Sequence, residues 1–259
     1  MVGQQLLAMR KISIHSSINM TNKMKKIGRY FLALCLALIL IIGTVLHTKT
    51  YQASEQAQAI SQTANQTKDY LYFKAYGERK GNILFYQGAL VEESSYASIA
   101  SNLSQDGYDV YILKAPLNLP ILAQQKALNI IEKKNLDNVY LAGHSLGGVV
   151  ASLNAEKSSK IQGLILLASY PSEKTDLSSD KLRVLSITAT NDKVLKWQNY
   201  ENAKKRLPES TQYRSIEGGN HGGFGDYGQQ SHDGKASLTS HEQNQEISQI
   251  VLNFLNGQA

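Results

Sequence analysis

From residue 69 onward, apolar positions follow two alternating patterns. Short runs rich in β-branched, aromatic and leucine residues predict strands, and segments with apolar residues every three or four positions predict amphipathic helices. Predicted strands cover residues 70–76, 82–87, 109–113, 138–142, 163–168, 183–188 and 212–216. Predicted helices cover residues 95–103, 120–134, 146–156, 194–207 and 242–255. This alternation predicts an α/β fold with a mostly parallel twisted sheet and helices on both faces, and the charged turn at 77–81 predicts an edge hairpin.

Residues 30–46 show a different pattern, because all seventeen are uncharged and nearly all are apolar. This length reaches the lower limit for a membrane-spanning helix, about 17 to 25 residues. Residues 1–49 contain seven Lys or Arg and no Asp or Glu, so we expect residues 1–29 to be cytoplasmic and the chain after Lys49 to be exported. We favour an uncleaved signal anchor over a cleaved signal peptide, because the apolar run is long and the small-residue site Ala57-Gln58-Ala59 lies far downstream.

The anchor divides the chain into parts of different composition. Residues 47–68, rich in Gln, Ala, Ser and Thr, predict a polar tether to a domain at 69–259. Met24, followed by two lysines, is an alternative translation start, in which case residues 1–23 would be an extension without structure. Cys35 is the only cysteine, so no intramolecular disulfide is possible.

The net charge of +6 is confined to the N-terminal segment. Removing its seven basic residues from the total of 27 leaves 20, against 21 acidic residues. The rest of the chain is therefore close to neutral, which argues against nucleic acid as a partner.

Candidate chemistry begins where the strand predicted at 138–142 runs into Gly143-His144-Ser145-Leu146-Gly147. A G-x-S-x-G run between a strand and a helix is typical of a nucleophile elbow, in which the serine lies on a sharp turn. Glycines on both sides let the strand and the helix approach each other. The alternative is a glycine-rich turn without chemistry or one that binds phosphate; the strand, the helix and the partners below favour Ser145 as a nucleophile.

A serine nucleophile needs a histidine base and a carboxylate to orient it, and in this type of site they follow in the order Ser, acid, His. We expect His221 as the base, because it lies in a glycine-rich loop after the strand at 212–216, whereas His232 and His241 lie in a polar loop and near the last helix. We expect Asp192 as the acid because it follows a strand end, although it is also a candidate helix N-cap. The rival acids are Asp176, Asp180 and Asp226.

An acyl-transfer site also needs backbone N–H groups to bind the oxyanion. We expect Leu146 to supply one and Ala89, in the loop after the strand at 82–87, to supply the other, with Leu90 as the rival. His144 is expected to have a structural role, because adjacent residues diverge from a turn. Three aromatic residues are candidates either for the substrate pocket or for the core or rim beside it: Tyr170, Phe224 and Tyr227.

Together these motifs resemble the α/β-hydrolase superfamily, most of all its compact bacterial dienelactone-hydrolase-like and carboxylesterase-like members. The resemblance covers about residues 70–257 and rests on the elbow and on Phe85-Tyr86-Gln87-Gly88, Pro116-Leu117-Asn118-Leu119, Thr190-Asn191-Asp192 and the run from Asn220 to Gly228. It implies the α/β-hydrolase fold and the triad Ser145, Asp192 and His221. Gln87 departs from the histidine that many relatives have before the oxyanion glycine.

The expected function is therefore a membrane-anchored serine hydrolase of the carboxylesterase type, acting outside the cell on a small acyl-containing substrate through an acyl-enzyme. Nothing in this chemistry needs a metal or cofactor, and no insertion is long enough for a sizeable cap domain. Two alternatives stay open: an acyltransferase with the same triad, and a catalytically silent, membrane-tethered binding domain.

Overall fold

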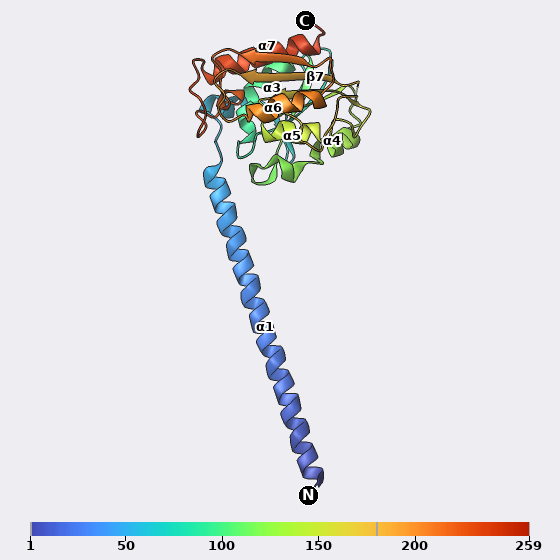
Figure 1. Cartoon of the computed structure of the whole chain (residues 1–259), viewed down its shortest axis with the longest axis vertical. Helices are drawn as coiled ribbons and strands as arrows, with labels where there is room; N and C mark the ends of the chain where they lie inside the picture. The colour runs from blue at the N-terminus through green and yellow to red at the C-terminus, as the bar shows by residue number, and fades with distance from the viewer. Residues whose placement is uncertain (1, 180, 259) are drawn as a thin grey trace. The chain divides into compact units, whose positions relative to one another are not determined.

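The computed structural model describes residues 2–179 and 181–258, with side chains described from Met24 onward. The chain divides into two compact units, residues 1–49 and residues 50–259 (Figure 1). The first is a single helix and the second contains the whole sheet.

The second unit is built on one eight-stranded sheet with the strand order β1-β2-β4-β3-β5-β6-β7-β8. Strands β3 to β8 are parallel to one another, whereas β1 pairs with β2 and β2 pairs with β4 in antiparallel orientation. The strands are β1 Asn65–Gln66, β2 Tyr70–Phe73, β3 Gly81–Tyr86, β4 Tyr108–Leu113, β5 Val139–His144, β6 Ile161–Leu167, β7 Arg183–Ala189 and β8 Gln212–Ile216. All seven predicted strands are present, and the expected mostly parallel α/β fold is confirmed.

The predicted edge hairpin is wrong. β2 pairs with β4, with Tyr70 opposite Leu113, and β4 lies between β2 and β3. The reason is that β4 can pair in parallel with β3 on one side and in antiparallel with β2 on the other, which buries it completely. The turn at 77–81 therefore connects two strands that are not neighbours.

Helices cover both faces of the sheet (Figure 1). The helices of this unit are α2 Glu55–Ser61, α3 Ala97–Gln105, α4 Lys126–Lys134, α5 Leu146–Ser152, α6 Trp197–Ala203 and α7 Ser240–Leu255, with short 3-10 turns η1 Glu93–Tyr96, η2 Pro116–Asn118, η3 Pro120–Ala123, η4 Lys204–Arg206 and η5 Gly222–Phe224. α3 and α7 pack on one face, where Ile99 and Val251 join a core with Ile83. α4 and α5 pack on the other, where Ile131 and Val150 join a second core with Leu84. The two cores follow from the alternation of side chains along buried strands.

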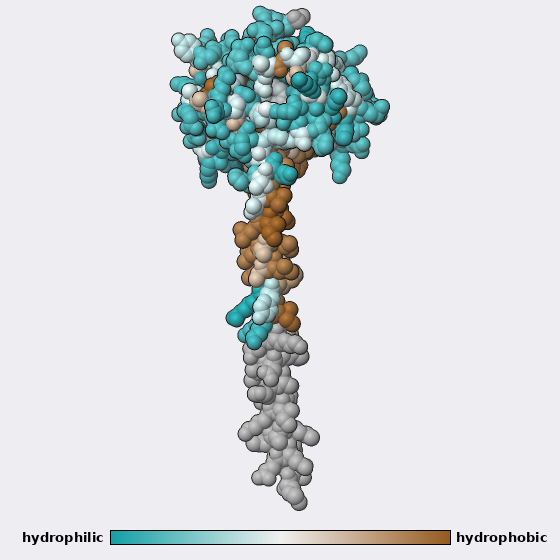
Figure 2. Space-filling model, turned by 90° about the vertical axis from the view of Figure 1, so that its left-hand side faces the viewer, coloured by the Kyte–Doolittle hydropathy of each residue, from teal (hydrophilic) through white to brown (hydrophobic). Residues whose placement is uncertain are grey.

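The first unit is helix α1, Val2–Lys49. Its stretch Met24–Lys49 is long and apolar enough to cross a membrane. Figure 2 shows this stretch as a band of mainly apolar side chains. Residues 2–23 continue the helical backbone, which differs from the expectation that an N-terminal extension would lack structure.

The expected polar tether over residues 47–68 differs most from the structure. The folded unit begins at Thr50, not at residue 69, and Ala57 is completely buried in α2. Ser54 caps α2 by accepting a hydrogen bond from the Ala57 N–H, and its own hydroxyl donates to Asp226. The segment is polar in composition because it is held by hydrogen bonds and small side chains instead of a regular apolar face, so its sequence resembles a linker.

Candidate active site

Ser145 occupies the sharp turn between β5 and α5. Its backbone has φ 52° and ψ −122°, a conformation that is strained for any residue with a side chain. Two hydrogen bonds hold it there: the Ser145 N–H donates to the Leu167 carbonyl at 2.9 Å, and the Ser169 hydroxyl donates to the Ser145 carbonyl at 2.6 Å. The predicted elbow geometry is therefore present around Ser145.

The glycines of the elbow are required by close backbone contacts. A Cβ at Gly143 would overlap the backbone of Gly147, and a Cβ at Gly147 would overlap the carbonyl groups of Tyr86 and Gln87. A Cβ at Gly148 would likewise overlap the Ser169 side chain. The G-x-S-x-G-G run thus lets α5 pack directly on the ends of β5 and β3.

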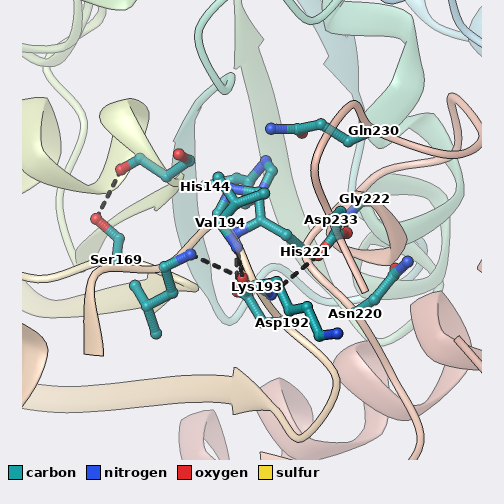
Figure 3. A network of polar contacts seen from close by, with 12 residues as sticks. His144, Ser169, Asp192, Lys193, Val194, Asn220, His221, Gly222, Gln230 and Asp233 are labelled. Carbon is teal, nitrogen blue, oxygen red and sulfur yellow. Dashed lines mark hydrogen bonds and ion pairs between the residues drawn. The ribbon is translucent and has the colours of Figure 1, made fainter. Parts of the chain in front are cut away.

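His221 and Asp192 form a buried pair at 2.7 Å between the His221 Nδ1 and an Asp192 carboxylate oxygen (Figure 3). The other carboxylate oxygen accepts hydrogen bonds from the N–H groups of Val194 and Leu195, both at 2.8 Å. Asp192 therefore fixes its own orientation with one oxygen and that of the imidazole with the other. It is not the N-cap of α6, because that helix begins at Trp197 and not at residue 194 as expected.

Ser145 and His221 line the same pocket, which has a volume of about 240 Å³. The Nε2 of His221 is buried and has no hydrogen-bond partner among the described residues. With Nδ1 bonded to Asp192, Nε2 is the nitrogen left to accept a proton. Ser145, His221 and Asp192, which are up to 76 residues apart in the sequence, are thus brought together.

The rival residues have other surroundings. His232 and His241 are exposed, and so is Asp176. Asp226 accepts a hydrogen bond from Ser54, and Asp180 lies outside the described residues. Of the three aromatic candidates for the pocket, Tyr170 lines it, whereas Phe224 and Tyr227 take the alternative place, in the core beside α3 and α7.

The loop after β3 lies beside the elbow, because Tyr86 at the end of β3 pairs with Gly143 of β5. Two of its N–H groups are occupied: Gly88 donates to the Tyr96 hydroxyl at 2.8 Å, and Leu90 donates to the Asn118 carbonyl at 2.7 Å. The N–H groups of Ala89 and Leu146 have no partner among the described residues. This leaves Ala89 rather than its rival Leu90 with a donor that is free to bind a substrate.

His144 is fully buried and has a structural hydrogen bond, as expected. Its Nδ1 lies 2.9 Å from the Tyr96 hydroxyl, and its ring lies 4.7 Å from that of His221, between centroids. Burial, together with the nearby His221, holds the pKa of His144 well below its usual range, so the ring is neutral. Burial raises the pKa of Tyr96, so its hydroxyl keeps its proton and can donate it to the neutral ring. Tyr96 thus connects the loop, through Gly88, to the elbow.

Several residues that support the site have no recognisable sequence motif. Gln243 of α7, almost fully buried, accepts from the Asn220 N–H and donates to the Asn220 carbonyl. Asp233 accepts from the N–H groups of Gly222 and Lys193 and so joins the His221 loop to the Asp192 loop. These contacts hold His221 in place from positions 11 or more residues away. Among the described residues, no group of three or more His, Cys, Asp or Glu is arranged to bind a metal ion.

Comparison with known proteins places this geometry in a family. A search of curated proteins gave no match. Among solved structures, the fold is similar to an alpha/beta hydrolase from the metagenome of sediments of the Mar Chica lagoon in Morocco, with 18% identity, a TM-score of 0.57, and coverage of 75% of this chain and 98% of that one. It is also similar to a predicted CIB-like hydrolase from Thermoplasma acidophilum, with 15% identity, a TM-score of 0.57, and coverage of 73% and 92%.

A carboxylesterase from Mesorhizobium loti shares the fold at 13% identity and a TM-score of 0.52, with coverage of 73% of this chain and 98% of that one. At these identities the likeness concerns the fold alone. The sequence model of the alpha/beta hydrolase family matches residues 82–245, which is more than half of the chain and includes Ser145, Asp192 and His221. The chain belongs to the alpha/beta hydrolase family.

Proposed function

We propose that this chain is a serine esterase of the carboxylesterase type, anchored in a membrane by α1. Ser145 is the nucleophile, His221 the general base and acid, and Asp192 the residue that orients His221. The N–H groups of Leu146 and Ala89 bind the oxyanion. Membership of the alpha/beta hydrolase family supports hydrolase activity, and esterases among the solved structures of similar fold support an ester as the substrate.

The reaction uses two acyl transfers. The Ser145 oxygen attacks the carbonyl carbon of the ester while its proton moves to the Nε2 of His221, and the oxyanion accepts hydrogen bonds from Leu146 and Ala89. When the C–O bond breaks, the protonated His221 gives this proton to the leaving alcohol. A water molecule then attacks the acyl-enzyme, passing a proton to His221, which returns it to Ser145 as the acid product leaves.

The observation that carries this proposal is the way Asp192 is bound. One oxygen is fixed by two backbone N–H groups and the other lies 2.7 Å from the His221 Nδ1, while the opposite ring nitrogen has no described partner and His221 shares a pocket with Ser145. A carboxylate oriented in this way selects the tautomer that a serine nucleophile needs. The helix N-terminus of α5, directly after Ser145, adds partial positive charge near the oxyanion.

We propose the membrane topology on separate grounds. The apolar stretch Met24–Lys49 begins among basic residues, so we infer a cytoplasmic N-terminus and a catalytic unit on the outer face. An uncleaved anchor is supported by the packing of α2. Cleavage at the small-residue site 57–59 would cut inside this helix, where Ala57 is fully buried, and would remove Tyr51 and Ser54 from the folded unit.

The direct test replaces Ser145 with alanine in the full chain. We expect hydrolysis of a short-chain aryl ester to fall by at least about 10⁴-fold, because the variant removes the oxygen that forms the acyl-enzyme. Labelling by a fluorophosphonate probe should disappear in the same variant, and Ser101→Ala on α3 is the matched control that should keep both.

Undiminished turnover and labelling in Ser145→Ala would refute the proposal, and a wild-type chain that is never labelled would favour a silent binding domain. Products formed with added alcohol would distinguish an acyltransferase.

A further inference from the structure

Three large apolar side chains are exposed on one short segment of the folded unit. They are Leu117, Ile121 and Leu122, with 49%, 45% and 55% of their surface exposed. We call residues 116–122 the apolar segment. It follows β4, whose last residue Leu113 pairs with Tyr86 of β3, and Tyr86 pairs in turn with Gly143 of β5. The apolar segment therefore begins at the carboxyl ends of the parallel strands, where Ser145 also lies.

The exposure of these side chains is imposed by the backbone. Pro116 and Pro120 start two successive 3-10 turns, and Leu117 and Asn118 between them have φ values of 55° and 53°. Positive φ is unfavourable for a bulky residue such as leucine, so the surrounding contacts must hold it there. Asn118 supplies them: its carbonyl accepts from the Leu90 N–H, and its side-chain oxygen accepts from Gln87. Apolar side chains that gather on one exposed segment, unlike those scattered singly, mark a contact with another protein or with a membrane.

The peptide link between α1 and the folded unit limits how far the end of the candidate membrane span can lie from the apolar segment. α1 ends at Lys49, and the next residue, Thr50, accepts a hydrogen bond from the Asn118 side chain through its Oγ1 at 3.2 Å. Tyr51 then donates its N–H to the Leu90 carbonyl. Consecutive Cα atoms are only about 3.8 Å apart, so the end of the span lies within about 10 Å of the Asn118 side chain whatever direction the helix takes. The apolar segment is thus attached next to the point where the chain would leave the bilayer.

We propose that the apolar segment is a second membrane contact, which inserts Leu117, Ile121 and Leu122 at the boundary between headgroups and acyl chains. This inference rests on the proposed membrane anchor. Exposed apolar side chains gain from such burial, and no polar tether separates them from the span. When the chain is attached at Lys49 and the apolar segment contacts lipid, the carboxyl ends of the strands, where Ser145 lies, face the bilayer. The substrate class is then an acyl ester presented at the membrane surface.

The test measures contact with lipid at single labelled positions in the full chain. In a Cys35→Ser background, Leu122→Cys carries an environment-sensitive NBD fluorophore, and the chain is reconstituted into phosphatidylcholine vesicles with and without doxyl-labelled lipid. The matched control is Tyr76→Cys. The Tyr76 side chain is 74% exposed, and the residue follows β2 near the amino ends of the parallel strands, away from Ser145. The wild-type chain labelled at Cys35 reports on the anchor itself.

We expect doxyl lipid to quench the probe at Leu122→Cys about twofold or more, as for a group at the headgroup boundary, and to leave the probe at Tyr76→Cys unchanged. Ile121→Cys provides a second reporter should Leu122→Cys fail to fold. Quenching at Cys35 without quenching at either reporter would overturn the second contact and leave the anchor standing. Absence of quenching at Cys35 would instead overturn the anchor, and with it this inference.

Discussion

The elbow and the loop after β3 contribute to the same site but are built in different ways. The elbow is local: strand β5, Ser145 and helix α5 occupy 14 consecutive residues, Val139–Ser152. The loop after β3 depends on distant segments, because Tyr51, Tyr96 and Asn118 all hydrogen-bond to residues 88–92. The proposed nucleophile is therefore specified by a short motif, whereas the proposed oxyanion donor, Ala89, depends on contacts from distant segments.

The two regions meet at two points. Gly147 of α5 packs against the carbonyl groups of Tyr86 and Gln87, and His144 of β5 lies against the Tyr96 hydroxyl that binds Gly88. Substitutions at these two contacts, and at the contacts that distant segments make with the loop, test whether the elbow and the loop after β3 depend on each other.

Among these changes, the largest effect is expected from Gly147→Ala. The added methyl group overlaps two backbone carbonyls, which cannot move without displacing the end of β3 from α5. Overpacking of this kind costs typically about 1 to 3 kcal/mol of stability, and displacement of the elbow should lower kcat/KM by at least about 100-fold. Ester hydrolysis and thermal unfolding measure the two effects. Gly28→Ala, where a Cβ meets no atom within 4 Å, is the control and should change neither; activity near wild type in Gly147→Ala would show that the elbow and the loop are not tightly packed.

A smaller effect is expected from Asn118→Gly, which affects only the loop. Glycine accepts the positive φ of 53° without strain, so the variant removes the side-chain bonds to Gln87 and Thr50 and leaves the backbone turn possible. We expect kcat/KM for a soluble ester to fall about tenfold, because the oxyanion donor is less well held, while fluorophosphonate labelling of Ser145 slows by a similar factor.

Asn135→Gly is the matched control for this experiment, because Asn135 has a similar φ of 49° and ends α4 away from the site. It should leave kcat/KM unchanged. Equal losses in the two variants would contradict a specific role of Asn118 in supporting the loop.

The smallest effect is expected from His144→Gln, and it concerns how the free energy of unfolding depends on pH. Burial keeps the pKa of His144 well below 6.5 in the folded protein, whereas the unfolded chain binds a proton near pH 6.5. As the pH falls below about 6.5, protonation favours the unfolded state, so the wild type loses stability until the pH reaches the depressed folded pKa. His144→Gln removes this titration, and its free energy of unfolding should decrease less between pH 7.5 and 5.5, by about 1 kcal/mol.

Urea unfolding of the full chain in mild detergent, followed by the fluorescence of the single tryptophan, Trp197, measures this difference. Titrating groups that do not contact His144 act on both proteins and cancel in the comparison. Parallel pH dependences in the wild type and His144→Gln would show that His144 is not kept neutral by folding.

Much of the fold was predictable from the sequence because the signals are local. All seven predicted strands are present, since buried strands of a parallel sheet read as short apolar runs. The order of the strands at the edge was not predictable: β4 lies between β2 and β3 because pairing on both sides buries it, and this depends on partners far along the chain. The fold of residues 50–68 was missed for a related reason. Its contacts are hydrogen bonds from Thr50, Tyr51 and Ser54 to distant loops, which leave no apolar periodicity.

The sequence by itself determined the α/β character of the domain, the apolar stretch and the candidate nucleophile, because each depends on residues within one turn or one strand of each other. Only the tertiary structure decided what surrounds Ser145. It brought His221 onto Asp192, and it gave the N–H groups of Gly88 and Leu90, but not that of Ala89, a partner among the described residues. It also replaced the expected tether by a direct attachment at Thr50. These contacts join residues that are distant in the chain, so only the packing of the whole sheet edge could determine them.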